Sequence, residues 1–385
     1  MKIVHLCLGA FFSDGYAYQE NMLPKFHKKL GYDVEVIASL VIFDKNGKVT
    51  LMDHAKEYIN EHGFLVKRLD YKKPYKIYER LRRYNGLAEA LEQATPDILF
   101  IHNCQFADID VVAKYLKKHP EINVYVDNHV DDLNSATNWL SKNVLHKIIW
   151  KHCAHTINPY VKKFFGVLPA RVAFLSEMYG LPADKCDLLV MGVDDDQVNR
   201  TIESNIGHKI RDKYRAANDD VLIMSGGKLN RYRPEVLNLL EAVNELNNPK
   251  IKVLFFGLVD EQYKSRFDAL VATGNIIDVG WLSVPQTYDY MSASDLLVFP
   301  GLHSVLWEQA VGMGKPCIFR KLEGFDHVDR GGNCLLLDDV SKDGIKKALL
   351  HVLHNNQLEE MTKRAKAVSN SFSYTEIAKQ AIEVE

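Results

Sequence analysis

The stretch that decides the fold runs from Val221, where it begins VLIMSGGKLNRYRPEVLNLLEAV, to Pro316, where it ends FPGLHSVLWEQAVGMGKP. Its first five residues form an apolar run, which predicts a buried strand. Apolar residues recur at helical spacing from 235 to 244 and predict a helix directly after it. A buried strand followed by a loop and a helix is the repeating unit of a parallel α/β sheet.

The loop between this strand and helix carries glycines and cations. We interpret Gly226 and Gly227 as a tight turn, because glycine lets the backbone turn sharply and approach a ligand. Lys228 and Arg233 add positive charge, and the start of a helix presents unpaired N–H groups. This combination predicts an anion site that suits a phosphate. The alternative is that both cations lie in solvent at a helix start.

The far end of the stretch offers the opposite charge. A strand at 296–299 leads into a loop and then into a helix that carries Glu308. A carboxylate can accept hydrogen bonds from two neighbouring hydroxyl groups of a sugar. The stretch therefore pairs a predicted phosphate site with a predicted sugar contact.

The same alternation of strands and helices covers the rest of the chain and predicts two doubly wound parallel sheets that face each other across a cleft. We place an amino-terminal domain at 1–196 together with a terminal helix at about 372–385, a linker at 197–218 and a second domain at 219–371. The predicted strands are 2–8, 34–38, 97–101, 123–127, 188–191, 221–225, 252–256, 276–279, 296–299, 317–319 and 334–337.

Composition limits the classes of function. The chain has 385 residues, 47% of them hydrophobic and 25% charged, with a net charge of -2, so it gives no global reason to bind nucleic acid. No apolar run reaches the roughly 20 residues of a membrane helix, and no signal peptide is evident. The six cysteines are scattered without a Cys-x-x-Cys pair, which favours reduced packing residues in a cytoplasmic protein.

In the first half, candidate site residues follow the strands, where open parallel sheets bind ligands. Gly15 and Tyr16 lie in the loop after the first strand, and the alternative is a plain connection. Asn103 and His129 each follow a later strand. Next to His129, Asp131 and Asp132 are candidates to hold an acceptor hydroxyl, although acidic loop residues are mostly solvated.

Three runs in the second half resemble one family: SGGKLNRYRPEVLNLLEAV, VGWLSVPQTYDYMSASDLLVFP and WEQAVGMGKP. They are similar to the nucleotide-sugar half of the retaining family 4 glycosyltransferases, which have the GT-B fold. GYAYQENMLPKFHKKLGYDVEVIA and LLVMGVD resemble the opening and closing segments of the family's first domain. The resemblance spans nearly the whole chain in the expected order.

The resemblance assigns roles to single residues. Lys228 and Arg233 match the family's two cations at the leaving diphosphate, and His129 matches a histidine beside the transferred sugar. Glu308 matches the second glutamate of Glu-x7-Glu, which holds the ribose. Here the chain departs from the family, because Pro300 stands where the first glutamate is expected and the loop is about four residues shorter.

This departure leaves two interpretations open. In one, His303 and Ser304 contact the donor together with Gly226, Gly227, Gly15, Tyr16 and Glu308. In the other, His303 caps the helix that follows, and donor binding is altered or lost.

The function that the resemblance implies is transfer of a sugar, with retention of configuration, from a nucleoside diphosphate sugar to a hydroxyl of a glycan, glycolipid or protein-linked sugar. UDP is the favoured nucleotide, and neither a metal nor another cofactor is expected. Two rival hypotheses are a catalytically silent GT-B subunit that stabilises a partner enzyme, motivated by Pro300, and a nucleotide-sugar epimerase.

Residues 72–91 bear on the acceptor. The segment is basic, and Ile77, Leu81, Tyr84 and Leu91 fall on one helical face. Such a helix either packs its apolar face on the sheet, which we favour, or contacts the inner face of an anionic membrane.

Overall fold

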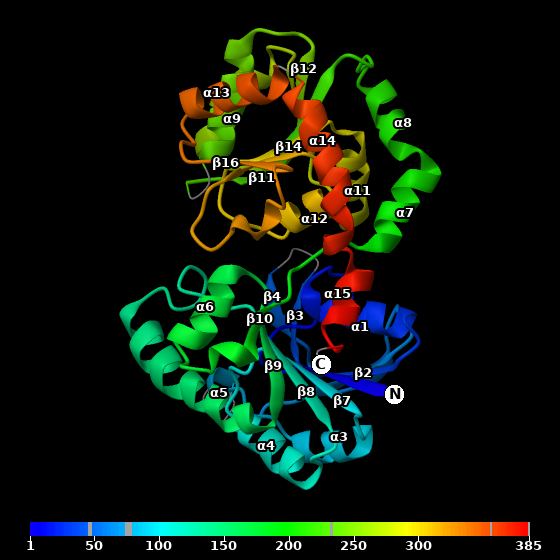
Figure 1. Ribbon diagram of the computed structural model, residues 1–385, viewed down its shortest axis with the longest axis vertical. Coiled ribbons are helices and arrows are strands. Elements are labelled where there is room, and N and C mark those ends of the chain that lie inside the picture. Colours follow the sequence, from blue (N-terminus) through cyan, green and yellow to red (C-terminus); the bar gives the residue numbers. More distant parts are fainter. Residues whose placement is uncertain (45–47, 74–78, 232–233, 355, 384–385) are drawn as a thin grey trace. The chain divides into compact units, whose positions relative to one another are not determined.

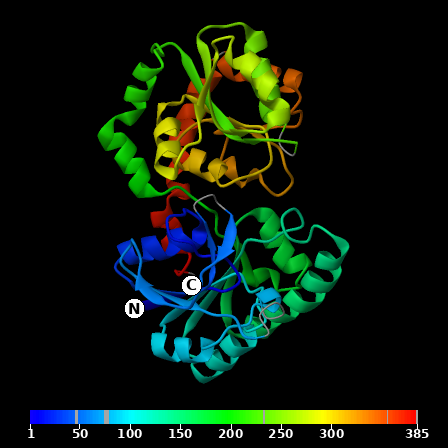
Figure 2. The same ribbon diagram turned by 180° about the vertical axis from the view of Figure 1, so that it is seen from behind.

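The structure is a computed structural model that describes residues 1–44, 48–73, 79–231, 234–354 and 356–383. It divides into two compact units, Met1–Val190 with Tyr374–Glu385, and Met191–Ser373. Each unit has its own sheet and its own helices (Figures 1 and 2). We call them unit 1 and unit 2.

Unit 1 is built on a sheet in the order β10-β9-β8-β7-β1-β2-β6-β5. All neighbouring strands are parallel except β5, which runs antiparallel to β6. The strands are β1 (Lys2–Cys7), β2 (Asp33–Ser39), β5 (Glu57–Ile59), β6 (Leu65–Leu69), β7 (Ile98–His102), β8 (Asn123–Asn128), β9 (Val161–Gly166) and β10 (Cys186–Leu188). A separate antiparallel pair joins β3 (Val41–Phe43) to β4 (Val49–Leu51).

Helices flank this sheet and contribute buried apolar side chains to the core of unit 1. They are α1 (Gln19–Lys29), α3 (Leu87–Ala94), α4 (Ile109–Lys118), the π-helix η1 (Ser141–Trp150), α5 (Lys151–Ile157), α6 (Pro169–Glu177) and α15 (Tyr374–Gln380). The last of these comes from the end of the chain and lies against α1, where the rings of Phe26 and Tyr374 stack with centroids 6.0 Å apart.

Unit 2 has an entirely parallel sheet in the order β13-β12-β11-β14-β15-β16. Its strands are β11 (Val221–Leu229), β12 (Ile251–Val259), β13 (Ile276–Gly280), β14 (Leu296–Phe299), β15 (Cys317–Arg320) and β16 (Cys334–Leu337). Its helices are α7 (Asp195–Ser204), α8 (Ile206–Lys213), α9 (Glu235–Leu246), α10 (Glu261–Val271), α11 (Val284–Ala293), α12 (Leu306–Gly312), α13 (Lys342–Leu353) and α14 (Gln357–Val368).

Residues 197–218, predicted as a linker, largely belong to α7 and α8. These helices are tied to unit 2: Arg200 forms an ion pair with Asp289 of α11, and Arg211 forms one with Asp295. The segment is charged because its outer face is exposed, and the few residues it buries are too widely spaced to mark a helix pair in the sequence.

The predicted glycine turn is wrong. Gly226 and Gly227 lie inside β11, which continues to Leu229 and pairs with β12 along its whole length. The glycines let the two strands approach closely. A Cβ on Gly226 would lie 2.0 Å from the carbonyl oxygen of Phe256, and a Cβ on Gly257 would lie 1.9 Å from the carbonyl oxygen of Gly227. A backbone contact this close excludes any side chain.

Both sheets have a point where the strand order reverses. In unit 1 it lies between β1 and β7, and in unit 2 between β11 and β14. The ladder from β11 to β14 ends at Met224, which pairs with Leu297, so β11 runs on past it. Ligands of open parallel sheets bind outside the carboxyl ends of the strands at such a reversal.

The described apolar residues of the 72–91 segment pack in the core, as favoured above, but the prediction of one continuous helix is wrong: Tyr84 forms an antiparallel bridge with Tyr71, and helix α3 begins only at Leu87. Tyr84 and Leu91 are buried, and Leu81 is partly buried. Ile77 lies outside the described residues, which omit 74–78. None of the helices in the described ranges combines the length and apolar character that crossing a membrane requires.

Candidate functional site

The carboxyl edge of the unit 2 sheet carries an unengaged cation. Lys228 is exposed near the end of β11, and within the described residues its ammonium group has neither an ion pair nor a hydrogen bond. Arg233, the second predicted cation, lies outside the described residues. At the end of β15, Arg320 donates to Glu235 Oε1 over 2.9 Å. Sequence reasoning missed this pair, because its members are 85 positions apart.

Glu308 lies fully buried between two histidines. Nε2 of His303 and Nε2 of His327 both lie 2.8 Å from Glu308 Oε1. Burial raises the pKa of Glu308, but the two histidines outweigh it and hold the pKa well below its usual range. The carboxylate is therefore ionised, and His303 orients it instead of capping the helix.

Several buried polar atoms around Glu308 have no partner in the described structure. Its own Oε2 accepts nothing, and Nδ1 of His327 and Nε1 of Trp307 are unpaired as well. Farther along the same edge, Ser225 Oγ and Glu235 Oε2 are also unpaired. An unpaired buried polar atom is costly, so a group of them indicates a ligand or bound water that completes their hydrogen bonds.

The remaining predicted residues of this loop have other positions. Pro300 and Gly301 are buried after β14, and a Cβ on Gly301 would lie 4.0 Å from the unpaired Glu235 Oε2. Ser304 is half-buried, and its carbonyl oxygen accepts from Trp307 N at the start of α12. The loop thus brings His303 and Glu308 together.

In unit 1, His129 lies at the carboxyl end of β8 between two carboxylates. Its Nε2 is 3.1 Å from Asp127 Oδ2 without an aligned hydrogen bond, and its Nδ1 is 4.0 Å from Glu20 Oε1. Burial lowers the pKa of His129, but Asp127 and Glu20 outweigh burial, so the pKa is raised above its usual value. The protonated, hydrogen-bond-donating form is therefore favoured.

Asn103 positions His129. The Oδ1 atom of Asn103 accepts from the backbone N–H of His129 over 2.8 Å, and Asn103 has a left-handed φ of 62°. Gly9 packs closely against Asn103, since a Cβ on Gly9 would lie 2.2 Å from the carbonyl oxygen of Asn103. Because Asn103 is buried, its side chain holds the backbone at His129 in place.

Behind His129, a chain of buried hydrogen bonds crosses the core of unit 1. His102 Nδ1 lies 2.7 Å from Asp127 Oδ2, and His102 Nε2 lies 3.0 Å from His5 Nδ1. His5 Nε2 lies 3.0 Å from His27 Nδ1, and His27 Nε2 lies 2.8 Å from the carbonyl oxygen of Ala378 on α15. These residues come from β8, β7, β1, α1 and α15.

The carbonyl oxygen of Ala378 only accepts, and this sets the direction of every bond in the chain. His27 must donate to it, so His5 donates to His27 and His102 donates to His5. The bond between His102 and Asp127 needs one more proton than three neutral rings supply.

The hydrogen bond between His102 and Asp127 joins two fully buried side chains. Burial raises the pKa of Asp127, but His102 and His129 outweigh burial and hold it well below its usual range. Asp127 is therefore ionised and accepts the hydrogen bond from His102.

This network predicts an acid-sensitive unit 1. Burial lowers the pKa of His5 well below its usual value and that of His27 to about 4. The unfolded histidines, with pKa about 6.5, bind protons more readily, so the stability they contribute is complete above about pH 6.5 and is lost as pH falls toward 4. Urea midpoints read by hydrogen exchange of β1 and β7 should drop between about pH 7.5 and pH 5. His27→Gln should reduce this drop, and equal midpoints in the native protein would contradict the assignment.

An aromatic cluster borders the loop after β1. The rings of Tyr16 and Tyr18 stack 5.7 Å apart, and Phe43 lies 5.0 Å from Tyr16. Gly15 is exposed and donates its N–H to Glu61. Both amide atoms of buried Gln19 lack a partner. Aromatic faces beside unpaired amides suit a sugar, and Tyr18 and Gln19 were not singled out by sequence reasoning.

The two aspartates have structural partners. Asp131 is buried, pairs with Arg171 over 2.9 Å and accepts from the backbone N–H groups of Leu133 and Asn134. Asp132 is exposed and pairs with Lys142 over 2.8 Å. Asp131 is engaged in these structural contacts, and its role as an acceptor contact stays a prediction.

Two clusters have residue types that bind metals: His102 with Asp127 and His129, and His303 with Glu308 and His327. In each, both imidazoles approach the same carboxylate oxygen over 2.7–3.1 Å. Those are hydrogen-bond and ion-pair distances. We therefore interpret both clusters as polar networks, and the expectation that no metal is needed stays a prediction.

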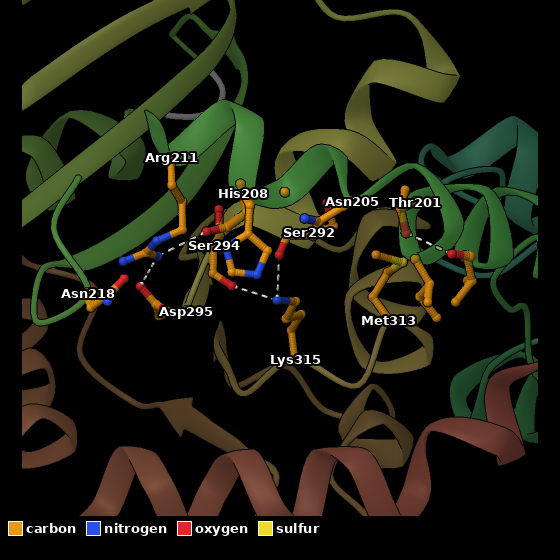
Figure 3. A pocket seen from close by; sticks show the side chains of 14 residues that line it. Thr201, Asn205, His208, Arg211, Asn218, Ser292, Ser294, Asp295, Met313 and Lys315 are labelled. Atoms are coloured by element: carbon orange, nitrogen blue, oxygen red, sulfur yellow. Dashed lines mark hydrogen bonds and ion pairs between the residues drawn. The ribbon is translucent and has the colours of Figure 1, made fainter. Parts of the chain in front are cut away.

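A cavity of about 600 Å³ in unit 2 lies elsewhere (Figure 3). Its Lys315 donates to the carbonyl oxygens of Ser292 and Ser294, and burial lowers the pKa of Lys315 to about 8. Ser294 and Lys315 lie two residues before the starts of β14 and β15. The cavity thus lies at the amino ends of the strands, on the opposite edge from Glu308, and is not part of the candidate site.

Comparison with known proteins agrees with this architecture. Residues 208–368, all in unit 2, match the family described as "Glycosyl transferases group 1". No curated protein sequence matches the chain. Among solved structures, a glycosyltransferase from Rickettsia africae ESF-5 has TM-score 0.66 and 16% identity and covers 100% of this chain and 99% of its own.

Two further structures cover nearly all of both chains. HepE from Anabaena in complex with UDP has TM-score 0.66 and 14% identity, with 99% of this chain and 98% of that chain covered. UDP-GlcNAc 2-epimerase from Neisseria meningitidis has TM-score 0.63 and 13% identity, with 100% and 99% covered. Residues 208–368 of unit 2 therefore match the group 1 glycosyltransferase family, and the chain as a whole has the GT-B fold of the similar structures.

Proposed function

We propose that this chain is a metal-independent retaining glycosyltransferase that moves a sugar from a nucleoside diphosphate sugar to a hydroxyl of a glycan, glycolipid or protein-linked sugar. The observation that carries the proposal is Glu308 Oε2, an ionised and unpaired acceptor buried at the carboxyl edge of a domain of the glycosyl transferases group 1 family. A ribose hydroxyl would complete its hydrogen bonds. UDP is the favoured nucleotide, because a structure similar to this chain contains UDP.

Pro300 does not argue against donor binding in this proposal. The family's first glutamate is missing, but two histidines hold the second one in its ionised form. His327, which sequence reasoning did not find, shares this task with His303. The loop therefore keeps one well-oriented carboxylate where the family pattern has two.

The reaction proceeds at the anomeric carbon of the donor. The bond from this carbon to the diphosphate oxygen breaks, and the bond to the acceptor oxygen forms on the same face of the sugar. The acceptor proton passes to the departing phosphate oxygen. Lys228 stabilises the charge that develops on the diphosphate, because its ammonium has no competing partner among the described residues.

His129 acts as a hydrogen-bond donor to the transferred sugar. Its raised pKa and the lack of an aligned hydrogen bond at Nε2 favour this role, whereas a protonated ring would not stabilise positive charge at the anomeric carbon. Tyr16 and Tyr18 offer a stacking surface for the acceptor, and Asp132 remains a candidate contact.

We also propose a cytoplasmic location: all six cysteines are free thiols, and burial raises the pKa of Cys7 and Cys104.

A ligand screen tests the proposal. Thermal shifts with UDP, GDP, ADP and their sugars should identify one nucleotide, since a ligand at a hundred times its dissociation constant stabilises by about 2.7 kcal/mol. Glu308→Gln should weaken that binding at least about tenfold, because a charged acceptor is lost, while the exposed Glu323→Gln should not. Binding without turnover on any acceptor would favour the silent subunit, and conversion of the donor without acceptor would favour the epimerase.

A further inference from the structure

One face of unit 1 exposes large apolar side chains that the candidate site does not use. Leu133, Trp139, Leu140, Leu145 and Ile148 are 66%, 74%, 60%, 36% and 62% exposed. All five lie within sixteen residues, on η1 and the loop before it. We call residues 133–151 the η1 surface. Exposed apolar groups gathered in this way mark a contact with a protein or a membrane.

The opposite side of η1 packs into unit 1, so the exposed side is not a loose helix end. His146 and Trp150 are buried, and His146 Nδ1 lies 2.9 Å from the hydroxyl of Tyr179. The helix runs directly into α5 (Figure 1). Leu140, Leu145 and Ile148 are thus held outward by a fixed helix.

The charged residues within this segment of the sequence have one sign. No aspartate or glutamate occurs from residue 133 to residue 176, while the segment has five lysines and one arginine. The chain as a whole has a net charge of -2, so this positive charge is local. Apolar and aromatic groups on a helix whose own charged residues are all cations complement an anionic membrane surface.

A cavity beside the helix fits a phosphate headgroup. It measures about 410 Å³ and is lined by Lys142, Lys147 and Lys151, with Asp132 and Glu177 also on its walls. Lys142 is neutralised by Asp132, and Lys147 donates to Asn143 over 2.9 Å. Within the described residues, the ammonium of Lys151 has no hydrogen bond or ion pair, so this cation is available.

We propose that the η1 surface binds an anionic phospholipid bilayer. Trp139, Leu140 and Ile148 enter the interfacial layer, and Lys147 and Lys151 bind headgroup phosphates. This membrane contact replaces the membrane contact that the sequence suggested for residues 72–91, because the described apolar residues of that segment pack inward. It places a unit of this glycosyltransferase against a surface on which lipid-linked acceptors reside.

Flotation of the full chain with vesicles tests this inference. The protein should bind vesicles of phosphatidylcholine mixed with phosphatidylglycerol, bind phosphatidylcholine alone much less, and dissociate as salt is raised. Trp139→Ser combined with Ile148→Ser should weaken binding at least about tenfold. Lys147→Gln combined with Lys151→Gln should weaken it about fivefold for each lysine and reduce the salt dependence.

The matched control is Trp281→Ser combined with Ile202→Ser, which removes two equally exposed side chains from unit 2 and should leave vesicle binding unchanged. Nucleotide thermal shifts should be the same in every variant, which separates this inference from the proposed function. Absence of vesicle binding in the native protein overturns the proposal. So does an η1 variant that binds as well as the native protein, or one that alters only the oligomeric state.

Discussion

Replacement of Asp127 by asparagine is expected to lower the free energy of unfolding of unit 1 by about 3–5 kcal/mol. The substitution removes the buried carboxylate that accepts from His102 and lies 3.1 Å from His129. The amide that replaces it carries no charge, so these buried groups lose their ionised partner. Such a loss is costly inside a core.

Urea unfolding read by hydrogen exchange measures this loss, with peptides from β1, β7 and β8 reporting on unit 1 and peptides from β14 and β15 as an internal reference. Asp132→Asn is the matched control. Asp132 is exposed and pairs with Lys142, so its replacement should cost less than about 1 kcal/mol. Equal losses in the two variants would show that Asp127 has no charged partner.

Replacement of Lys228 by alanine is expected to lower kcat/KM for the donor by about 10²–10³. Its ammonium is the described cation at the carboxyl end of β11 that has no partner, so all of its charge is available to the departing diphosphate. Because this charge develops in the transition state, kcat should fall more than donor affinity. Initial rates of nucleoside diphosphate release at varied donor concentration separate the two.

Lys264→Ala is the control, because Lys264 is an exposed lysine of α10 that pairs with Asp268. It should leave turnover unchanged. Lys228→Arg should retain part of the activity, since the charge stays while its geometry changes. Full activity of Lys228→Ala would mean that another cation stabilises the leaving group.

Much of the fold could be predicted because buried parallel strands are nearly continuous apolar runs. Lys2–Cys7, Leu296–Phe299 and Cys334–Leu337 stand out in this way and were found almost to the residue. The strand Leu65–Leu69 was missed because Lys67 and Arg68 interrupt it. Arg68 is buried and donates hydrogen bonds to the carbonyl oxygens of Phe12 and Ser39. No local sequence pattern predicts these bonds.

The sequence by itself determined that the chain forms two parallel α/β sheets and which acidic and basic residues follow their strands, since both properties depend on neighbours along the chain. Only the tertiary structure decided that Gly226 and Gly227 belong to a strand, that His327 joins Glu308, and that His27, His5 and His102 link α15 to Asp127. The reason is physical. These contacts join residues brought together by strand pairing and helix packing, and hydrogen bonds over 19 to 351 positions leave no periodic trace in the sequence.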